Sequence, residues 1–445
     1  MRYMSALDDK PTLEVILLLV LFWYFGVRHK SIRLKVASTA QELDDVFRLR
    51  HEVFIQERGK FSSSSLDYPR IVDHFDTLPG VANVVAYEGS QAIATLRVNR
   101  DSPIGLPADE HYDFSDVRSR LELQYQDSTG QQPIFVSGSM LAIHKDWRYK
   151  KNVIFALFKE AIGVMYSWQA THVMATISEE SLSLYGRLGF EAIDEPLWSE
   201  SVGDTLVPLL APFDKVFDWA FGSISTKVSH FWLDNFCTDF ERLLLAPGEV
   251  IFSQHESADY AYAVDNGWVS ISRTDPDGNE MILANLSKGA LFGELAIFEG
   301  ETRDATATAF VNTELIAIKR HHMLDIIRQN PDKLDQLLEH FARRIRETDN
   351  LAMVLAFAPQ TQRVEVVLNR LWDSAVPDRK KPQTKIARVG PQQLAKTAQV
   401  RETEVRRVLE IKKAKGYLNY GDNVVKFLRQ PKSVDKIEFI KESPV

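Results

Sequence analysis

Cysteine is nearly absent from this sequence, since Cys237 is the one thiol among 445 residues. That excludes a disulfide framework within one chain and a cysteine-rich metal site, and it is typical of a reducing cytoplasm. We expect no metal site. An excess of basic residues is also missing, because the formal net charge is -8. The average charge therefore gives no support for nucleic-acid binding, and each segment has to be judged by its own charge.

Long apolar runs are scarce, and the longest candidate is Leu13–Val27, followed by Arg28-His29-Lys30. It is shorter than the roughly 20 residues that span a bilayer. Two Asp and a Lys before it, and no small-residue cleavage site after it, argue against a secretory signal. Three interpretations stay open: weak association of a cytoplasmic protein with the inner membrane through residues 13–27, a buried helix, and an over-extended gene start.

The length exceeds what one hydrophobic core organises, so we expect two to three domains. The first block, about Ile32 to Ile224, alternates helical and strand patterns and predicts an α/β fold. The predicted elements are helices at Thr39–Phe54 and Val153–Ala170, a hairpin of Asn83–Tyr87 with Gln91–Val98, and strands at Phe135–Ile143 and His172–Ile177.

The second block, about Phe240 to Ile327, has short alternating strands between turn signals. This rhythm predicts an antiparallel β-roll or barrel. The helical stretch Pro331–Phe357 follows with an apolar stripe, which either packs on its own domain or forms a dimer helix.

The third block, about Gln362 to Pro431, predicts two short helices and a hairpin. We expect Arg379–Lys385 to form a basic turn or loop. The predicted helices are Pro391–Ala398 and Glu402–Lys415, with Leu394, Ala395, Val405, Val408 and Ile411 in their shared core, and the hairpin pairs Tyr417–Asn419 with Val424–Phe427.

One segment of the second block, Phe292–Thr306 (FGELAIFEGETRDAT), has the residues of an anion and sugar site. Gly293 permits a close backbone approach, and Glu294 can accept hydrogen bonds from ribose hydroxyls. Arg303 can pair with a phosphate, and a helix beginning after Gly293 would direct its amides at an anion.

With Ala246–Phe252 and the glycines Gly267 and Gly289, this block resembles the cyclic-nucleotide-binding domain of the cyclic-AMP receptor protein and of protein-kinase regulatory subunits. The resemblance implies that cyclic AMP, or alternatively cyclic GMP, binds with its ribose on Glu294, its phosphate on Arg303 and its adenine near Thr348. Asp304 departs from the usual Ser, Thr or Ala, and a carboxylate there weakens phosphate binding unless it turns away. A roll that binds nothing is the alternative. The implied site comprises Gly293, Glu294, Leu295, Arg303, Asp304, Ala305 and Thr348.

The second helix of the third block has a basic outer face formed by Arg401, Thr403, Arg406 and Arg407. Arginine there can bind phosphates or read guanine edges. The block resembles the winged helix-turn-helix of bacterial regulators of the cyclic-AMP receptor protein/FNR family, in which Arg407 falls on a base-reading arginine. The resemblance implies double-stranded DNA as a partner and a homodimer. A solvated helix in an ordinary bundle is the alternative.

The first block contains five short motifs: Arg48–Glu57, Asp73–Asp76, Ala94–Arg97, Gly105–Pro107 and Tyr185–Phe190. Together they resemble the N-acyl amino acid synthases and acyl-homoserine-lactone synthases, two branches of the GNAT acyltransferase fold. The resemblance implies transfer of an acyl group from a thioester to an amino acid amine. It places Arg50, Asp73, Asp76 and Arg97 around the amine.

The resemblance also places the donor's phosphopantetheine at Arg148, Lys150, Lys151 and Asn152. This loop lacks the glycines of the coenzyme-A consensus, so acyl carrier protein is favoured over acyl-CoA. Ser137 and Met140 stand where relatives often have Glu and Arg, so no general base is evident. His74 and His144 are candidates, although a lone histidine is more often structural. A domain that binds an acyl ligand without turnover is the alternative.

We therefore predict a multidomain α+β protein: a GNAT-like domain, a β-roll with a long dimer helix, and a winged helix-turn-helix. Three functions stay open: a nucleotide-responsive regulator with an active acyltransferase, a regulator that senses an acyl ligand, and a nucleotide-regulated acyltransferase with a vestigial DNA-binding domain. The predicted boundaries are 1–31 for the hydrophobic segment, 32–224, 225–330, 331–360 and 361–431 for the folded parts, and 432–445 for the tail.

Overall fold

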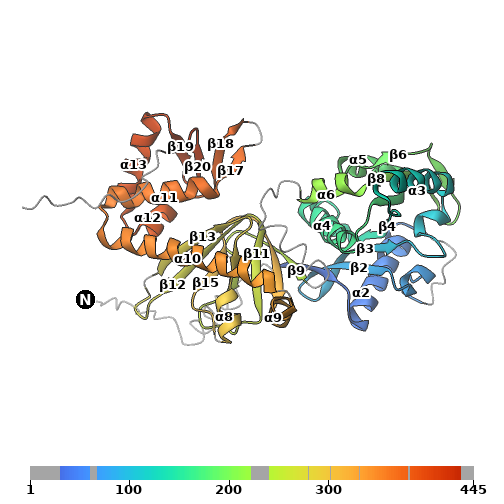
Figure 1. Ribbon diagram of the computed structural model, residues 1–445, viewed down its shortest axis with the longest axis horizontal. Coiled ribbons are helices and arrows are strands. Elements are labelled where there is room, and N and C mark those ends of the chain that lie inside the picture. Colours follow the sequence, from blue (N-terminus) through green and yellow to red (C-terminus); the bar gives the residue numbers. More distant parts are fainter. Residues whose placement is uncertain are drawn as a thin grey trace, which may run out of the picture.

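The computed structural model arranges the described chain in three successive parts (Figure 1). The structure describes residues 31–60, 68–221, 240–278, 280–300, 302–329, 331–378 and 381–431. Within these residues no helix is both long enough and apolar enough to cross a membrane. The apolar run 13–27 and the tail 432–445 lie outside the described residues.

The first part is a mixed sheet with helices, as its sequence pattern predicts. Thr39 begins the first helix, because its hydroxyl accepts from the Glu42 amide while the Glu42 carboxylate accepts from the Thr39 amide. This reciprocal capping box fixes a helix start. The elements are β1 (Ile32–Val36), α2 (Ala40–His51), the π-helical turn η1 (Glu52–Glu57), η2 (His74–Thr77), β2 (Val81–Glu88), β3 (Gln91–Arg100), η3 (Pro107–Glu110), α3 (Ser115–Thr129), β4 (Phe135–Ile143), η4 (Lys145–Trp147), α4 (Lys151–Ser167), β5 (His172–Ser178), η5 (Glu179–Ser181), α5 (Leu182–Arg187), β6 (Glu191–Ala192), β7 (Leu197–Ser199), β8 (Asp204–Pro212) and α6 (Phe213–Phe221).

Strands β4 and β5 pair in parallel at their beginnings, and the last paired residues are Ser137 and Met174. Further along β4, the register with β3 shifts between Ser139 and Ala142, which leaves an extra residue in β4. Met140 lies in this bulge with a φ of 53°. A non-glycine residue in the left-handed region carries strain, and such strain clusters at functional sites. The two strands therefore separate beyond Ser137.

The second part is an antiparallel roll, as its turn residues predict. At Gly267 the φ is 96°, and a Cβ there would lie 2.7 Å from atoms of Asn312 and Thr313, so a larger residue does not fit. The elements are β9 (Phe240–Leu245), β10 (Val250–Phe252), β11 (Tyr260–Asn266), β12 (Trp268–Thr274), β13 (Glu280–Ser287), β14 (Leu291–Phe292), α8 (Glu294–Glu299), β15 (Thr306–Ala309), β16 (Thr313–Lys319) and α9 (Arg320–Gln329).

Strand β9 joins the first and second parts in one sheet, and it lies between them in Figure 1. It pairs with β16 on one side and with β1 on the other, where Arg242 is opposite Leu34. Leu244 belongs to the hydrophobic core of the first part, whereas Leu243 and Leu245 pack in the core of the roll. Since side chains alternate along a strand, this run of leucines serves two cores. The sequence pattern does not predict the shared sheet.

The third part is helical and ends in a small sheet, with α10 at its predicted bounds. Two expectations are wrong. Lys381–Lys385 belongs to a strand, because β18 pairs with β17 and β20, while Arg379 and Lys380 lie outside the described residues. Ile411 is 41% exposed, because the helical period turns Leu409 into the core instead. The elements are α10 (Pro331–Phe357), α11 (Gln360–Ser374), β17 (Val376–Asp378), β18 (Lys381–Ala387), α12 (Pro391–Ala398), α13 (Glu402–Ala414), β19 (Leu418–Gly421) and β20 (Val424–Phe427).

Candidate functional site

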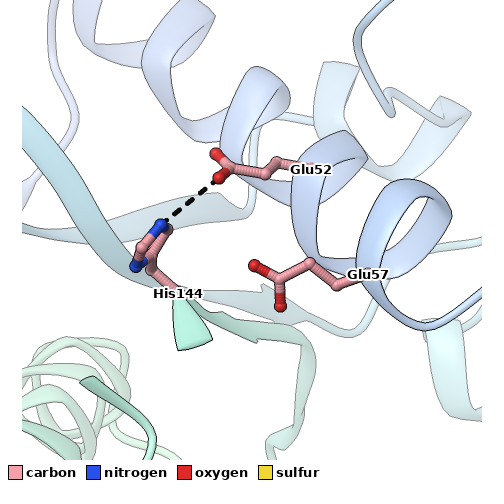
Figure 2. Close-up of side chains that lie close together, drawn as sticks. All are labelled: Glu52, Glu57 and His144. Atoms are coloured by element: carbon pink, nitrogen blue, oxygen red, sulfur yellow. Dashed lines mark ion pairs between the residues drawn. The ribbon is translucent and has the colours of Figure 1, made fainter. Parts of the chain in front are cut away.

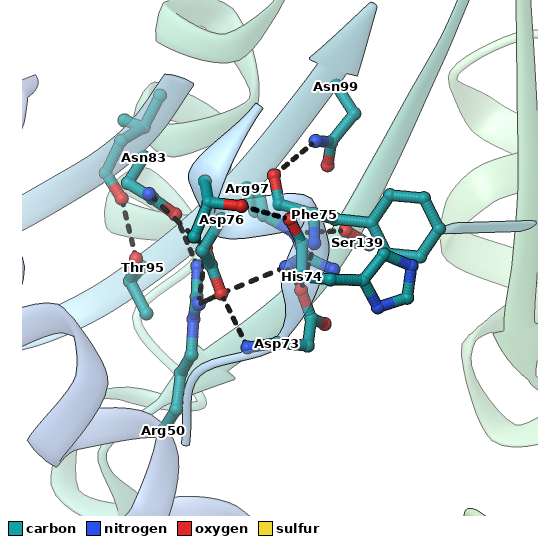
Figure 3. A network of polar contacts seen from close by, with 12 residues as sticks. Arg50, Asp73, His74, Phe75, Asp76, Asn83, Thr95, Arg97, Asn99 and Ser139 are labelled. Carbon is teal, nitrogen blue, oxygen red and sulfur yellow. Dashed lines mark hydrogen bonds and ion pairs between the residues drawn. The ribbon is translucent and has the colours of Figure 1, made fainter. Parts of the chain in front are cut away.

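Two arginines and two aspartates of the first part form a buried network, the amine-pocket cluster (Arg50, Asp73, Asp76 and Arg97; Figure 3). Arg50 of α2 donates to both carboxylate oxygens of Asp76 at 3.0 Å. Arg97 of β3 lies 3.0 Å from Asp76 and 2.5 Å from Asp73. The structure thus brings together all four residues that the sequence analysis assigned to the amine.

The turn η2 holds the two aspartates in place. The Asp73 carboxylate accepts from the Phe75 amide, and the Asp76 carboxylate accepts from the Asp73 amide. Burial raises the pKa of Asp76, but the charges of Arg50 and Arg97 outweigh it, so that its pKa lies below the ordinary value. Asp76 is therefore ionised at neutral pH and holds both guanidinium groups.

A cavity of about 750 Å³ lies where β4 and β5 separate. Ser137 to Leu141 of β4 line one side, and Thr176 to Ser178 of β5 line another. Its size and its position between two strands suit an extended ligand that enters between them.

The amine-pocket cluster meets this cavity on one side. Asp73 and Arg97 line it, whereas Arg50 and Asp76 lie behind them with side-chain exposures of 0% and 1%. Arg97 also donates from Nε to the Ser139 hydroxyl at 3.0 Å, which connects the cluster to the strand that carries the bulge. Two of the four predicted residues can therefore contact a ligand, and two hold them in position.

The residues predicted to bind the donor arm are divided in space. Arg148 lines the cavity, but its guanidinium binds Glu57 and donates to the Ile143 carbonyl at 3.1 Å. The other three are exposed where α4 begins, and cations and helix amides at such a place attract an anion. They are Lys150, Lys151 and Asn152.

Neither histidine that the sequence analysis considered as a base lines the cavity. His74 is 56% exposed at its side chain, with Nε2 3.8 Å from Glu110, and His144 has Nε2 3.3 Å from Glu52. His111 does line it. The sequence does not assign His111 to the site. Its signal is its position four residues after the end of the motif Gly105–Pro107.

Glu52, Glu57 and His144 are a possible metal-ligand set, because their ligand atoms lie within 4.8 Å of one another. The turn η1 directs both glutamates towards His144 (Figure 2). Two carboxylates and an imidazole suit a divalent cation. However, the Arg148 guanidinium already binds Glu57, and it would repel a second cation. These contacts instead tie η1 to the loop before α4.

In the roll, Glu294 and Arg303 are buried near Gly293, with exposures of 0% and 3%. Gly293 has a φ of 73°, and a Cβ there would lie 2.8 Å from the Arg303 guanidinium. Arg303 donates to the carbonyls of Gly293 and Tyr260 at 2.6 Å, and its guanidinium lies 4.2 Å from the Phe252 ring centre. Burial lowers the pKa of Arg303 from its ordinary value. The segment therefore buries a carboxylate and a guanidinium close to Gly293.

The other residues predicted for the nucleotide surround this pair. Leu295 is 48% exposed at the start of α8, and Ala305 is partly buried before β15. Asp304 is exposed, unlike the buried Arg303 beside it. Solvent therefore screens the Asp304 carboxylate, which reduces the penalty expected from this departure.

Helix α10 has a long exposed apolar stripe. The side chain of Thr348, predicted to reach the adenine, lies outside the described residues. An apolar stripe of this length on a surface helix is typical of contact with another helix. The exposed side chains are Leu334, Leu338, Ile345, Met353 and Phe357.

The residues predicted for DNA are exposed on or next to α13. Arg406 donates to Glu402 at 2.7 Å, and Arg407 donates to Glu404 at 2.7 Å. Exposed pairs of this kind are weak, so phosphates or base edges can replace the carboxylates. The exposed set is Arg401, Thr403, Arg406 and Arg407.

A second buried network, the junction cluster (Lys159, Glu160, Arg242, Asp265 and Glu314), lies where the first part meets the roll. Arg242 of β9 binds Asp265 of β11 and lies 3.5 Å from Glu160 and 3.6 Å from Glu314. Lys159 of α4 lies 2.7 Å from Glu314 and 3.4 Å from Asp265. The helix that begins beside the cavity is thus paired with two strands of the roll.

Two buried carboxyls of the junction cluster differ in protonation. Burial raises the pKa of Glu160 to about 8, which exceeds the lowering by Arg242. Burial acts on Asp265 too, but Arg242 and Lys159 bring its pKa below the ordinary value. At pH 7 Glu160 is therefore mostly protonated, whereas Asp265 is ionised.

Family models match two segments of the chain. Residues 242–330 match the cyclic nucleotide-binding domain, and residues 45–212 match the N-acyl amino acid synthase FeeM. Over 200 residues the chain is 31% identical to the cyclic AMP receptor protein of Thermus thermophilus, an alignment that covers 45% of this chain and 89% of that protein. The chain belongs to the cyclic AMP receptor protein family. Ahead of its regulator part it carries a synthase-like segment.

Two further relatives support membership in this family. The CRP-like cAMP-activated global transcriptional regulator of Mycobacterium tuberculosis is 33% identical over 124 residues, covering 28% of this chain and 55% of that protein. The cAMP-activated global transcriptional regulator CRP of Pasteurella multocida is 37% identical over 117 residues, covering 26% of this chain and 56% of that protein. The chain thus spans just over half the length of these two relatives.

Proposed function

We propose that this family member is a DNA-binding transcription regulator that responds to a cyclic nucleotide, with cyclic AMP favoured over cyclic GMP, and that it acts as a homodimer. The exposed basic face of α13 is the observation that carries the proposal. Helices α12 and α13 share a buried core and are followed by the hairpin β19–β20, which is typical of a winged helix-turn-helix. The apolar stripe of α10 supports pairing of two protomers.

The buried Glu294 and Arg303 of the roll support nucleotide control. Glu294 can accept the ribose hydroxyls, and Arg303 can bind the cyclic phosphate if it exchanges the carbonyls of Gly293 and Tyr260 for phosphate oxygens. That exchange would change the contacts of β11 and α8. In the dimer, it would select one spacing of the two α13 helices over another.

DNA binding to genomic fragments, measured by fluorescence anisotropy at one fixed salt concentration, tests this proposal. Cyclic AMP should raise the affinity. Arg407→Ala should weaken binding by about 1–3 kcal/mol, as expected for a base-reading arginine. Lys413→Ala, in the last turn of the same helix, is the matched control and should change it little. Equal affinity with and without nucleotide would overturn the proposal.

For the first part we propose the GNAT fold and transfer of an acyl group from a thioester to an amino acid amine. The cavity between β4 and β5, with Asp73 and Arg97 in its wall, supports this assignment. Backbone amides at the Met140 bulge are candidates to bind the thioester carbonyl. Cationic residues before α4 suit a phosphopantetheine phosphate, and acyl carrier protein stays the favoured donor over acyl-CoA. Release of free thiol from an acyl donor and amino acids tests turnover, because a sensor would bind without releasing thiol.

The junction cluster favours a second candidate, in which the nucleotide controls acyl transfer. It links α4, which begins at the cavity, to β11, whose Tyr260 carbonyl binds Arg303. Thiol release measured on the full chain with and without cyclic AMP tests it. Equal rates would exclude this candidate and leave the DNA-binding proposal standing.

A further inference from the structure

The acyl transfer proposed above needs a proton acceptor. An amino acid amine is an ammonium at neutral pH, and nitrogen attacks a carbonyl only with a free lone pair. Ser137 stands where relatives often have Glu, and it is buried with a neutral hydroxyl. The carboxylate of Asp73 is already paired with Arg97. Another group that lines the cavity is therefore the better candidate for the acceptor.

His111 is anchored beside the place where β4 and β5 begin to separate. It follows the turn η3, which packs on both strands. Leu106 and Ala108 of this region are buried in one cluster with Phe135 of β4 and Met174 of β5. His111 then lines the cavity that opens beyond these residues. Its backbone thus follows a turn that is anchored in the core, and the residue itself lines the cavity.

The His111 ring is available as a base. Among the described residues it has no hydrogen-bond partner, whereas His74 and His144 each face a carboxylate. Partial burial lowers the pKa of His111, against the opposing charge of Glu110. Each cationic side chain in the cavity lining is paired with a carboxylate, so partial burial is the main cause of the lowered pKa of His111. These cationic residues are Arg58, Lys60, Arg70, Arg97 and Arg148.

We propose that His111 is the general base that deprotonates the acceptor amine. A ring nitrogen takes one proton from the ammonium, and the freed amine forms the C–N bond at the thioester carbonyl. The C–S bond then breaks, and the second amine proton goes to the leaving thiolate. His111 returns its proton to water, so one proton is released for each amide formed. The inference rests on the proposed acyl transfer.

The test compares His111→Gln with His74→Gln in the full chain, by thiol release from acyl carrier protein or acyl-CoA donors. His111→Gln should lower kcat by about 10²–10⁴-fold, the usual contribution of a general base, with KM for the donor little changed. In His111→Gln the fall of kcat/KM on the acidic side of the pH profile should disappear, because that fall reports protonation of the base. Imidazole should restore activity to His111→Ala, and His74→Gln should behave as the wild type.

Several outcomes would overturn the inference. Wild-type kcat in His111→Gln would do so directly. A lowered rate with the acidic limb intact and no rescue by imidazole would assign His111 a structural role instead. A wild-type chain that releases no thiol with any amino acid would overturn the acyl-transfer proposal and the base together.

Discussion

The amine-pocket cluster and the junction cluster use the same chemistry for different purposes. Each buries arginine against carboxylates, with Arg50 and Arg242 both at 0% exposure. The amine-pocket cluster reaches a cavity through Asp73, which is 26% exposed at its side chain. The junction cluster instead lies between the first part and the roll. One arrangement can position a ligand, and the other fixes how two parts of the chain are joined.

The two clusters also differ in how well their polar atoms are paired. At the amine pocket, Arg50 donates to Asp76 and to Asn83, and Nε is its one buried atom without a hydrogen bond in the described structure. At the junction, Nε and Nη2 of Arg242 and Oε2 of Glu160 lack a hydrogen bond among the described residues. Buried charges are costly unless fully paired, so the junction should be the more sensitive to a lost partner.

Removing the central arginine of the junction should have the largest effect. Arg242→Met leaves the buried Asp265 and the partly buried Glu314 with Lys159 and Lys288 as nearby cations, and breaking such a network costs about 3–5 kcal/mol. The free energy of unfolding from urea titration measures the loss. Because β9 belongs to both cores, far-UV and tryptophan signals should both shift.

Arg33→Met is the control for this prediction. Arg33 lies on β1, is 42% exposed at its side chain and pairs with Glu241 of β9 at 3.7 Å. An exposed pair contributes within about 1 kcal/mol. Equal losses in Arg33→Met and Arg242→Met would show that burial at the junction has no special cost.

Asp76→Asn should have the next largest effect, on stability. It removes the ionised carboxylate between Arg50 and Arg97, and leaving two buried guanidinium groups underpaired costs about 3 kcal/mol. Urea unfolding of the variant measures this loss. An unchanged midpoint would show that Asn83 and Asp73 suffice to pair the two arginines.

Asp73→Asn, in the same cluster, should act on activity instead. The Asp73 side chain is partly exposed at the cavity wall, and the buried Arg97 keeps Asp76 as a partner, so the free energy of unfolding should fall by less than in Asp76→Asn. The amine loses a charged hydrogen-bond partner, so kcat/KM for the amine should fall. The fall should correspond to a loss of about 1.5–3 kcal/mol of transition-state stabilisation. Steady-state thiol release measures the loss of activity, and urea unfolding measures the loss of stability. A loss of stability without a fall in kcat/KM would contradict a ligand-facing role for Asp73.

Local signals explain which elements the sequence predicts well. Helices α10 and α12 match their predicted bounds, since each begins at a proline and has a clear apolar period. Strand β4 also matches, because β-branched and aromatic residues mark it. Glu294 and Arg303 likewise both lie buried near Gly293, because they belong to one short segment.

Long-range pairing explains what the sequence does not predict. The run Leu243-Leu244-Leu245 is apolar on both faces, a sign of a strand between two cores, but nothing local names β1 as its partner. Likewise, His111 gains its place at the cavity from the packing of η3 on β4 and β5. Motif resemblance identified the four residues of the amine-pocket cluster but could not tell which two reach the cavity.

Taken over one pH unit, the smallest effect concerns protonation at the junction. The pKa of Glu160 is raised to about 8 in the folded chain, from an ordinary value of 4.5. Between these values the folded chain keeps a proton that the unfolded chain has lost, so stability should fall as pH rises through this window, by at most about 1.4 kcal/mol per pH unit. Glu160→Gln is neutral at every pH and should remove this part of the dependence. The difference in the free energy of unfolding between wild type and variant, measured from pH 5 to 8, isolates the titration of Glu160. A flat difference would mean that Glu160 is ionised beside Arg242, and that both clusters hold their carboxylates charged.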